Sequence, residues 1–204
     1  MSVAEFHAML ASEVEPYKRN RAFGALLATA SGLGESGLTV VGGSALEIYT
    51  AGDYVSRDID LVAAQPKKVE TVLKKWGFHK TGMYWEHPHF GSSVQIVGRY
   101  DSGSPSRSQI VATPFGKVRL ASMEDIVWKR VYEARGWNRP EALDEAALLV
   151  RRYSDRLDWE YIQAKGRENG VGDLVEELRR NRGVLSTGPA GKQSVPSRPK
   201  RNSK

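Results

Sequence analysis

Two carboxylates placed two positions apart are the residues of this chain most suited to chemistry. Asp58 and Asp60 lie within residues 56–62, SRDIDLV, which read as a β-strand. Side chains alternate between the two faces of a strand, so both carboxylates point one way while Ile59 and Leu61 point the other. Two negative charges this close repel each other unless a cation lies between them. Mg²⁺ fits this pair, because it takes oxygen ligands and often shares its coordination shell with substrate phosphates.

A glycine turn precedes this strand by the length of a short helix. Gly42, Gly43 and Ser44 follow the strand-like run at 38–41, and residues 45–51 read as a helix. A glycine turn that opens a helix presents backbone N–H groups suited to phosphate. Together with the two carboxylates, the turn predicts a metal-assisted transfer from a nucleoside triphosphate.

Each of these elements also has a purely structural interpretation. Acidic residues two apart occur on solvent-facing edge strands, and paired glycines often only allow a chain to turn. Ser44 and Glu47 have the spacing of a capping box, in which Ser44 closes the start of the helix. The two elements occur together in this order, and their combination favours the phosphate and metal site.

The runs GGSAL (42–46) and SRDIDL (56–61) resemble the nucleotidyltransferase fold of polymerase-beta-like enzymes. More narrowly, they resemble the bacterial AbiEii-type group, which includes toxins of toxin–antitoxin pairs. The resemblance covers about residues 35–180 and continues through Tyr84-Trp85, residues 94–97, residues 120–126, Arg139 and Asp144. It implies an α+β fold: a nucleotidyltransferase-like mixed sheet with flanking helices, followed by a C-terminal helical bundle.

The resemblance also implies roles for single residues. Gly42, Gly43 and Ser44 would contact the triphosphate, while Asp58 and Asp60 would bind Mg²⁺ as catalytic residues. Lys129 would meet a phosphate, unless it is only a solvated lysine of a surface helix.

Gln95 occupies the position where such proteins carry a third carboxylate. It lies in the strand-like run VQIV at 94–97. Glutamine cannot act as a general base, and its neutral amide oxygen is a weaker metal ligand than a carboxylate. Glu86 or Asp101, which flank the same hairpin, would replace it if the register of the strands is offset.

Three functions follow from these residues. The leading one is a Mg²⁺-dependent nucleotidyltransferase that moves a nucleoside monophosphate from an NTP to an acceptor. The resemblance implies tRNA or another RNA end as acceptor, and a toxin role with a cognate antitoxin as partner. The second is a nucleotide- or RNA-binding protein of the same fold in which Gln95 has ended catalysis. The third is a partner-binding subunit without nucleotide chemistry.

The charge of the chain is concentrated at its C-terminal end. The 204 residues carry a net charge of +6, of which residues 183–204 contribute five cations and no acid. This segment is rich in Gly, Pro and Ser and is expected to be disordered. It either draws RNA in by counterion release or only keeps the protein soluble.

Composition places the chain in the cytoplasm by default. The absence of cysteine excludes disulfides and thiolate metal sites. No apolar run reaches the roughly 20 residues that span a bilayer. Walker-type and Gly-x-Gly-x-x-Gly loops are absent, which argues against P-loop and dehydrogenase functions.

Hydrophobic periodicity divides the chain into residues 1–121, a nucleotidyltransferase-like domain, residues 122–182, a helical subdomain, and the tail. Two helices are expected within 4–30, broken near Pro16, and a loop at 32–37. Strands are expected at 38–41, 57–63, 78–86, 93–99 and 109–120, the last interrupted at 114–116. Helices are expected at 45–51, 66–76, 123–134, 141–153, 159–167 and 173–182. The run His87-Pro88-His89 predicts a turn rather than a pair of metal ligands. Trp85 is a candidate for stacking on a nucleobase.

Overall fold

The computed structural model describes residues 3–99 and 103–184. Most of the tail, 185–204, and Asp101 therefore lie outside the described residues. The described helices are α1 (Val3–Ser12), α2 (Pro16–Ala30), α3 (Gly34–Gly37), α4 (Gly42–Thr50), α5 (Pro66–Lys75), α6 (Met123–Gly136), α7 (Glu141–Tyr153), α8 (Trp159–Glu168) and α9 (Gly172–Arg180). The strands are β1 (Leu38–Val41), β2 (Asp58–Ala63), β3 (His79–Thr81), β4 (Tyr84–Glu86), β5 (Ser93–Gly98), β6 (Gln109–Thr113) and β7 (Gly116–Leu120).

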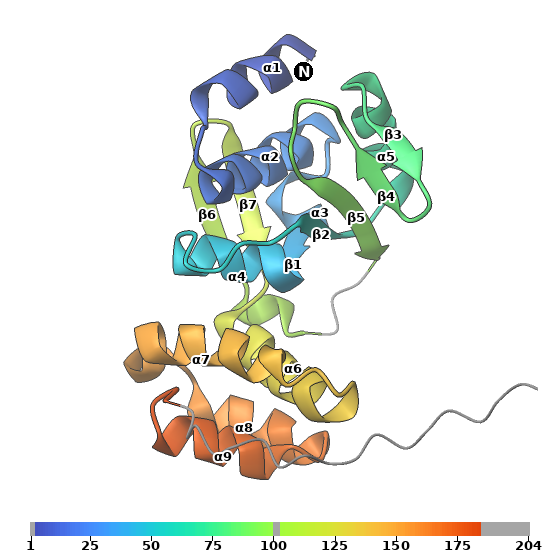
Figure 1. Cartoon of the computed structure of the whole chain (residues 1–204). Helices are drawn as coiled ribbons and strands as arrows, with labels where there is room; N and C mark the ends of the chain where they lie inside the picture. The colour runs from blue at the N-terminus through green and yellow to red at the C-terminus, as the bar shows by residue number, and fades with distance from the viewer. Residues whose placement is uncertain (1–2, 100–102, 185–204) are drawn as a thin grey trace, which may run out of the picture.

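All seven strands form one mixed sheet in the order β3-β4-β5-β2-β1-β7-β6. The central pair β1 and β2 is antiparallel, whereas β7 joins β1 and β5 joins β2 in parallel. Helices α6–α9 follow the sheet in the sequence and lie beyond the end of β7 (Figure 1). The expected α+β class, a mixed sheet with flanking helices and C-terminal helices, is confirmed. The division of the chain into domains stays a prediction.

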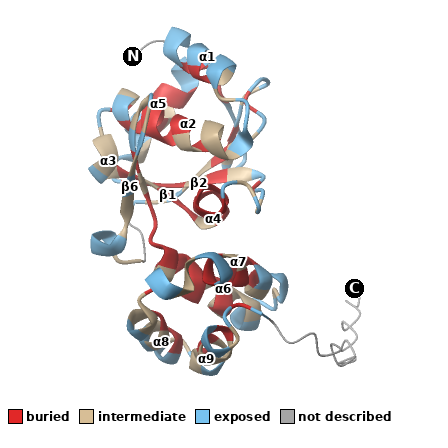
Figure 2. Ribbon diagram, turned by 90° about the vertical axis from the view of Figure 1, so that its left-hand side faces the viewer, coloured by how far each residue is buried: buried red, intermediate tan, exposed pale blue. Residues whose placement is uncertain are grey.

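The two faces of the central strands differ in polarity, as the alternation of side chains requires. One face carries Val40, Ile59, Leu61, Val94 and Leu120, all fully buried. This face belongs to the main core, and buried residues also line α2, α4 and α5 (Figure 2). We call the opposite side the open face, because its side chains are mostly polar and half-buried.

Helix α4 connects the sheet to the C-terminal helices. The Tyr49 hydroxyl donates to the carbonyl oxygen of Ala121 at 2.8 Å, just before α6 begins. From α7, the Tyr153 hydroxyl donates to the Tyr49 carbonyl oxygen at 2.8 Å, and Arg152 donates to the carbonyl oxygen of Thr50. These contacts satisfy carbonyl groups at the end of α4 that have no partner within the helix. The end of α4 is thereby held to the residue before α6 and to α7.

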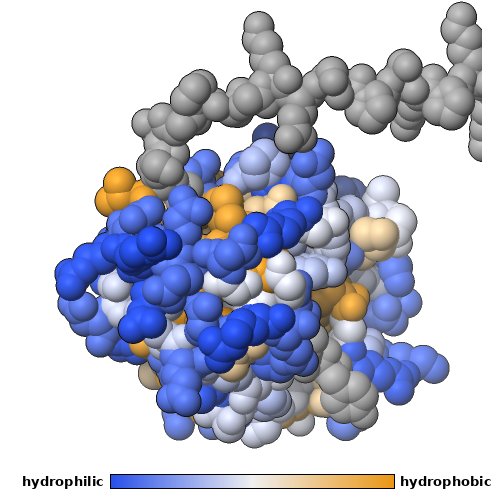
Figure 3. Space-filling view, turned by 90° about the horizontal axis from the view of Figure 1, so that it is seen from below, coloured by the Kyte–Doolittle hydropathy of each residue, from blue (hydrophilic) through white to orange (hydrophobic). Residues whose placement is uncertain are grey.

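The surface of the C-terminal helices is mainly polar. Seen from below, this end of the molecule is largely hydrophilic, with hydrophobic residues in small scattered patches (Figure 3). Among the described residues, no helix has the length and apolar character needed to cross a membrane.

Several sequence predictions about local structure were wrong. Helix α4 begins at Gly42, three residues before the expected start, and Ser44 does not cap it. Ser44 lies in the first turn, and its hydroxyl donates to the Val41 carbonyl oxygen at 3.0 Å. The expected loop at 32–37 contains α3, and the expected strand at 78–86 is the hairpin β3–β4 around Gly82, whose φ of 60° permits a tight turn. The other elements agree to within a few residues at their ends.

Candidate functional site

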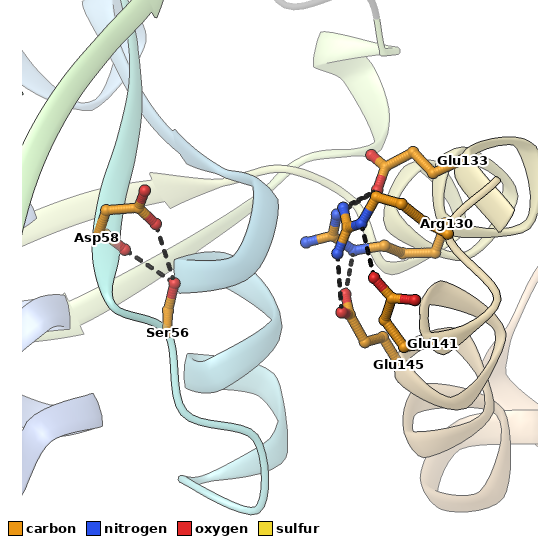
Figure 4. A network of polar contacts seen from close by, with 7 residues as sticks. Ser56, Asp58, Arg130, Glu133, Glu141 and Glu145 are labelled. Carbon is orange, nitrogen blue, oxygen red and sulfur yellow. Dashed lines mark hydrogen bonds and ion pairs between the residues drawn. The ribbon is translucent and has the colours of Figure 1, made fainter. Parts of the chain in front are cut away.

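Asp58 and Asp60 lie on the open face of β2, both half-buried, as the alternation of the strand predicted. The Ser56 hydroxyl donates to the backbone carbonyl of Asp58 at 2.9 Å and approaches its Oδ1 atom at 3.4 Å. Ser56 therefore fixes the start of β2 and the Asp58 side chain together (Figure 4).

Asp60 is the more perturbed of the two carboxylates. Burial, followed by the charge of Asp58, raises the pKa of Asp60 to about 6, although Arg130 opposes the shift. A carboxylate with this pKa is still mainly ionised at pH 7, and it then lies beside a second negative group. A divalent cation would relieve this repulsion, and two carboxylates are suitable ligands for Mg²⁺.

The start of α4 packs directly against Asp60. A Cβ atom added at Gly42 would lie 2.6 Å from Asp60 Oδ2, and Gly42 has a φ of 60°. A Cβ atom at Gly43 would lie 2.8 Å from Ser56 Oγ and 3.2 Å from the Tyr54 hydroxyl. A side chain at Gly42 would displace the Asp60 carboxylate, and the positive φ at Gly42 also favours glycine. A side chain at Gly43 would displace Ser56 or Tyr54.

Helix α4 begins without a side-chain cap, since its N-cap residue is Val41. The N–H groups of its first turn are thus not satisfied by a capping side chain, and they lie next to the two carboxylates. Such a helix start favours a negatively charged ligand such as a phosphate. The Ser44 side chain is fully buried and turned toward Val41. Contact of Ser44 with a phosphate stays a prediction.

Opposite the carboxylates, α6 and α7 carry a network of charged side chains. Arg130 Nη1 lies 2.6 Å from Glu133 Oε2, and Arg130 Nε lies 2.8 Å from Glu145 Oε2, the latter as an ion pair without good hydrogen-bond geometry. Arg139 is 2.8 Å from Glu133, 3.2 Å from Glu141 and 3.2 Å from Glu145. Figure 4 shows Arg130 on the side of this network that faces Asp58. Burial raises the pKa of Glu145, and the two arginines oppose that shift.

Lys129 lies at the same junction. A cavity of about 40 Å³ between the start of α4 and α6 is lined by Gly42, Asp125, Lys129, Arg130 and Glu133, among others. This volume is close to that of a water molecule, so the cavity cannot hold a whole nucleotide. Lys129 and Gly42 both line this cavity, and contact of either residue with a phosphate stays a prediction.

Gln95 lies next to Asp60 across the sheet. The two residues are Cα partners on the parallel strands β5 and β2, so their side chains share the open face. The Gln95 amide nitrogen is 3.2 Å from Met83 Sδ.

Glu86 is placed differently. It is on β4, two strands from β2, and it pairs with Thr81 and His79 at 3.0 and 3.5 Å. Two strand spacings amount to about 9.5 Å, so Glu86 does not replace Gln95. Within the described parts of the chain, no three His, Asp or Glu residues form a metal-binding group.

Sequence reasoning missed Arg130, Glu133 and Glu145. Residues 126, 130 and 133 have the spacing of one helical face, and this spacing could have placed Arg130 and Glu133 side by side. The prediction that Trp85 stacks on a nucleobase is wrong. Trp85 is 2% exposed, and Lys74 and Lys80 lie over its ring. His87 packs against Phe6 and Phe78, in agreement with a structural turn.

No family model and no curated protein matches the chain. A solved structure to which it is similar is MenT4, a nucleotidyltransferase toxin from Mycobacterium tuberculosis H37Rv. The two share 19% sequence identity over 88% of this chain and 73% of that chain, with a TM-score of 0.44. This likeness is too distant to assign a function, so the roles proposed below are argued from the side chains of the present chain.

Proposed function

We propose that this protein is a Mg²⁺-dependent nucleotidyltransferase that moves a nucleoside monophosphate from an NTP to an acceptor hydroxyl. The observation that carries the proposal is the packing of Asp60 against Gly42, at a predicted Cβ distance of 2.6 Å. Asp60, a candidate metal ligand, thus lies against a helix start suited to phosphate.

Asp58 and Asp60 would hold the metal, and their oxygen donors fit a hard divalent ion. When bound, Mg²⁺ would neutralise charge on the triphosphate and stabilise the attacking and leaving oxygens. The first turn of α4 would bind the phosphates through backbone N–H groups, and Lys129 would add positive charge from α6. The charge of Arg130 is already matched by Glu133 and Glu145. The protein's main contribution is thus positioning and electrostatic stabilisation.

In the transfer itself, the acceptor oxygen forms a bond to the α-phosphorus while the bond from that phosphorus to the bridging oxygen breaks. Pyrophosphate leaves, and the proton of the acceptor hydroxyl passes to water. Gln95 cannot take this proton, because its amide is neutral and not basic.

The finer assignments rest on the sequence resemblance. It supports an AbiEii-like toxin whose acceptor is tRNA or another RNA end and whose partner is an antitoxin. A second candidate function, nucleotide binding without transfer, is favoured by one observation: an amide at Gln95, beside Asp60, where a third carboxylate would otherwise complete the site.

Incubation of the protein with each α-labelled NTP, Mg²⁺ and total RNA tests the proposal. We expect label in RNA with the wild-type chain, and a loss of at least about 100-fold in Asp60→Asn, as for other groups that stabilise transition-state charge. Asp155→Asn is the matched control, because Asp155 is exposed on the short turn Ser154–Arg156, away from the sheet. Equal activity of Asp60→Asn and wild type would exclude this site. NTP binding by calorimetry, with no transfer to any acceptor, would select the second function.

A further inference from the structure

A second and larger cavity lies on the open face of the sheet. Its volume is about 390 Å³, and its floor includes Thr39 of β1 and Val62 of β2. Arg99, Arg119 and Ser108 are among the residues that form its walls. Nothing in the proposed transfer site uses these residues. We call this hollow the basic cavity.

The basic cavity reaches β2 at Val62, beyond Asp60 on the side away from α4. Val62 follows Asp60 by two residues, so both side chains are on the open face, about 6.6 Å apart along the strand. Across the ladder, Asp60 pairs with Val41 and Val62 pairs with Thr39. Gly42 and the start of α4 follow Val41 directly. Asp60 therefore separates a phosphate-binding helix start from the basic cavity.

Arg119 brings an uncompensated charge to this cavity. Its Nε donates to the Glu35 carbonyl oxygen at 2.9 Å, and its Nη1 donates to the Pro105 carbonyl oxygen at 3.2 Å and to Ser108 Oγ. All three acceptors are neutral, so they fix the guanidinium in place without cancelling its charge. Among residues 3–99 and 103–184, no carboxylate forms an ion pair with Arg119 or Arg99.

The positive lining continues from the basic cavity to the start of α5. An adjoining hollow of about 240 Å³ shares Ala64 and Arg99 with it and adds Lys67 and Lys68. Neither lysine forms an ion pair with a described residue. Helix α5 adds few N–H donors there, because Pro66 has no N–H and the Lys68 N–H donates to the Gln65 carbonyl oxygen at 3.0 Å. Four cations thus line the two hollows, and none of the described lining residues is acidic.

We propose that the basic cavity binds a phosphodiester of the acceptor and, continuing over α5, the next phosphate along the same chain. This inference rests on the proposed function and specifies its acceptor. In-line transfer requires the attacking hydroxyl and the leaving pyrophosphate on opposite sides of the reacting phosphorus. With the triphosphate at the start of α4, the acceptor enters from the other side of Asp60, which is where the basic cavity lies. Arg99 and Arg119 are positioning residues in this arrangement, since they hold the phosphate and do not touch the reacting atoms.

Binding measurements test this directly, without relying on turnover. The full-length chain is titrated into a fluorescently labelled single-stranded oligonucleotide of ten nucleotides, and anisotropy is followed over a range of salt concentrations. We expect Arg99→Gln, and the double variant Lys67→Gln with Lys68→Gln, each to weaken binding about 3- to 10-fold. The slope of log K against log salt falls by about one unit per cation removed. The affinity for Mg²⁺ and NTP stays unchanged in calorimetry.

Two control variants match these substitutions. Lys75→Gln changes a lysine at the other end of α5, and Arg180→Gln changes an exposed arginine of α9. The five cations of residues 183–204 are present in every variant, so they do not contribute to the differences. Arg119→Gln is not the primary variant, because the loss of its three hydrogen bonds would also disturb the fold.

The outcomes separate the inference from the proposed function. Oligonucleotide binding that is weakened in the cavity variants supports the inference, even if the wild-type chain shows no transfer. Equal binding in the wild type, the cavity variants and the controls overturns it. Binding of inorganic phosphate in calorimetry, with no oligonucleotide binding, also overturns it, because the cavity would then be a site for a free anion.

Discussion

The Oδ2 atom of Asp60 lies so close to the backbone of Gly42 that a Cβ atom at Gly42 would be 2.6 Å from it. No ordinary side chain fits this distance. The contact brings the start of α4 to the edge of the carboxylate pair. It is possible because residue 42 is a glycine and has no Cβ atom. A metal held by Asp60 and a phosphate held by α4 could therefore touch.

Gly42→Ala tests this contact. The added methyl group must displace Asp60 or the start of α4, so we expect transfer activity to fall by about 100-fold, as when a charge-stabilising group is lost. The substitution also strains the backbone, because φ is 60° at Gly42, at a cost of about 1 kcal/mol. Activity is measured by label transfer and stability by urea unfolding.

Gly82→Ala is the control for strain alone. Gly82 has the same φ of 60°, but nothing lies within 4 Å of the position that its Cβ would take. We expect it to lose about the same stability as Gly42→Ala and to keep full activity. Wild-type activity in Gly42→Ala would show that the close approach has no functional role.

The raised pKa of Asp60 predicts how the stability of the metal-free protein depends on pH. Because the pKa is about 6 in the folded state and 3.8 in the reference state, the folded protein binds more protons than the unfolded one between these values. The free energy of unfolding therefore decreases as pH rises from about 4 to about 6 and is flat above that. Asp60→Asn removes this dependence and should stabilise the protein at pH 7 by on the order of 2 kcal/mol.

Urea unfolding in the presence of a chelator, at pH values from 4 to 8, measures this effect. Asp155→Asn should follow the wild-type curve, since Asp155 is exposed. A wild-type curve that rises steadily from pH 4 to 8, with Asp60→Asn always below it, would contradict the charge repulsion assigned to Asp58 and Asp60.

Gln95→Glu distinguishes a protein that transfers nucleotides from one that only binds them. The variant places a carboxylate beside Asp60 on the open face, in register with it. If transfer is limited by the lack of a third carboxylate, the rate of transfer rises by about 10- to 100-fold in this variant. The affinity for NTP changes little, because a general base contributes to the chemical step. Ala164→Glu, at an exposed position of α8, serves as the control for added negative charge. An unchanged rate with an active wild type would mean that position 95 takes no part in the chemistry.

The alternation of a strand was enough to place Asp58, Asp60 and Gln95, because it is a local property of the backbone. Ser44 could not be placed this way. Its capping-box spacing with Glu47 was present, but packing against β2 begins α4 earlier and buries the hydroxyl. Tertiary packing thus overrode a local rule that would hold for an isolated helix.

Contacts between distant elements were beyond the reach of the sequence. The pairing of Arg130 with Glu145 depends on how α6 packs on α7, and the basic cavity joins Arg99 to Arg119 through the sheet order. Neither relationship has a fixed spacing along the chain. Trp85 shows the same limit, because its burial depends on α5 lying over β4, as the position of Lys74 above its ring indicates.

Asp125 anchors the junction between the sheet and the C-terminal helices. Its carboxylate is 1% exposed and accepts hydrogen bonds from the Ser104 N–H, the Ser122 and Tyr161 hydroxyls and the Trp128 indole, at 2.8–3.0 Å. Burial alone would raise the pKa of Asp125, but these hydrogen bonds outweigh it and lower the pKa below its ordinary value. The carboxylate is therefore a stabilising group in its charged form.

Asp125→Asn should destabilise the protein by about 2–4 kcal/mol at pH 7, because the amide NH₂ group replaces an acceptor with a donor that faces other donors. The folded pKa lies below the unfolded one, so the wild-type advantage is complete above about pH 4 and is lost as pH falls through the folded pKa. Urea unfolding of wild type, Asp125→Asn and the exposed control Asp155→Asn from pH 3 to 8 measures this. Equal stability of Asp125→Asn and wild type at pH 7 would show that the four hydrogen bonds do not stabilise the fold.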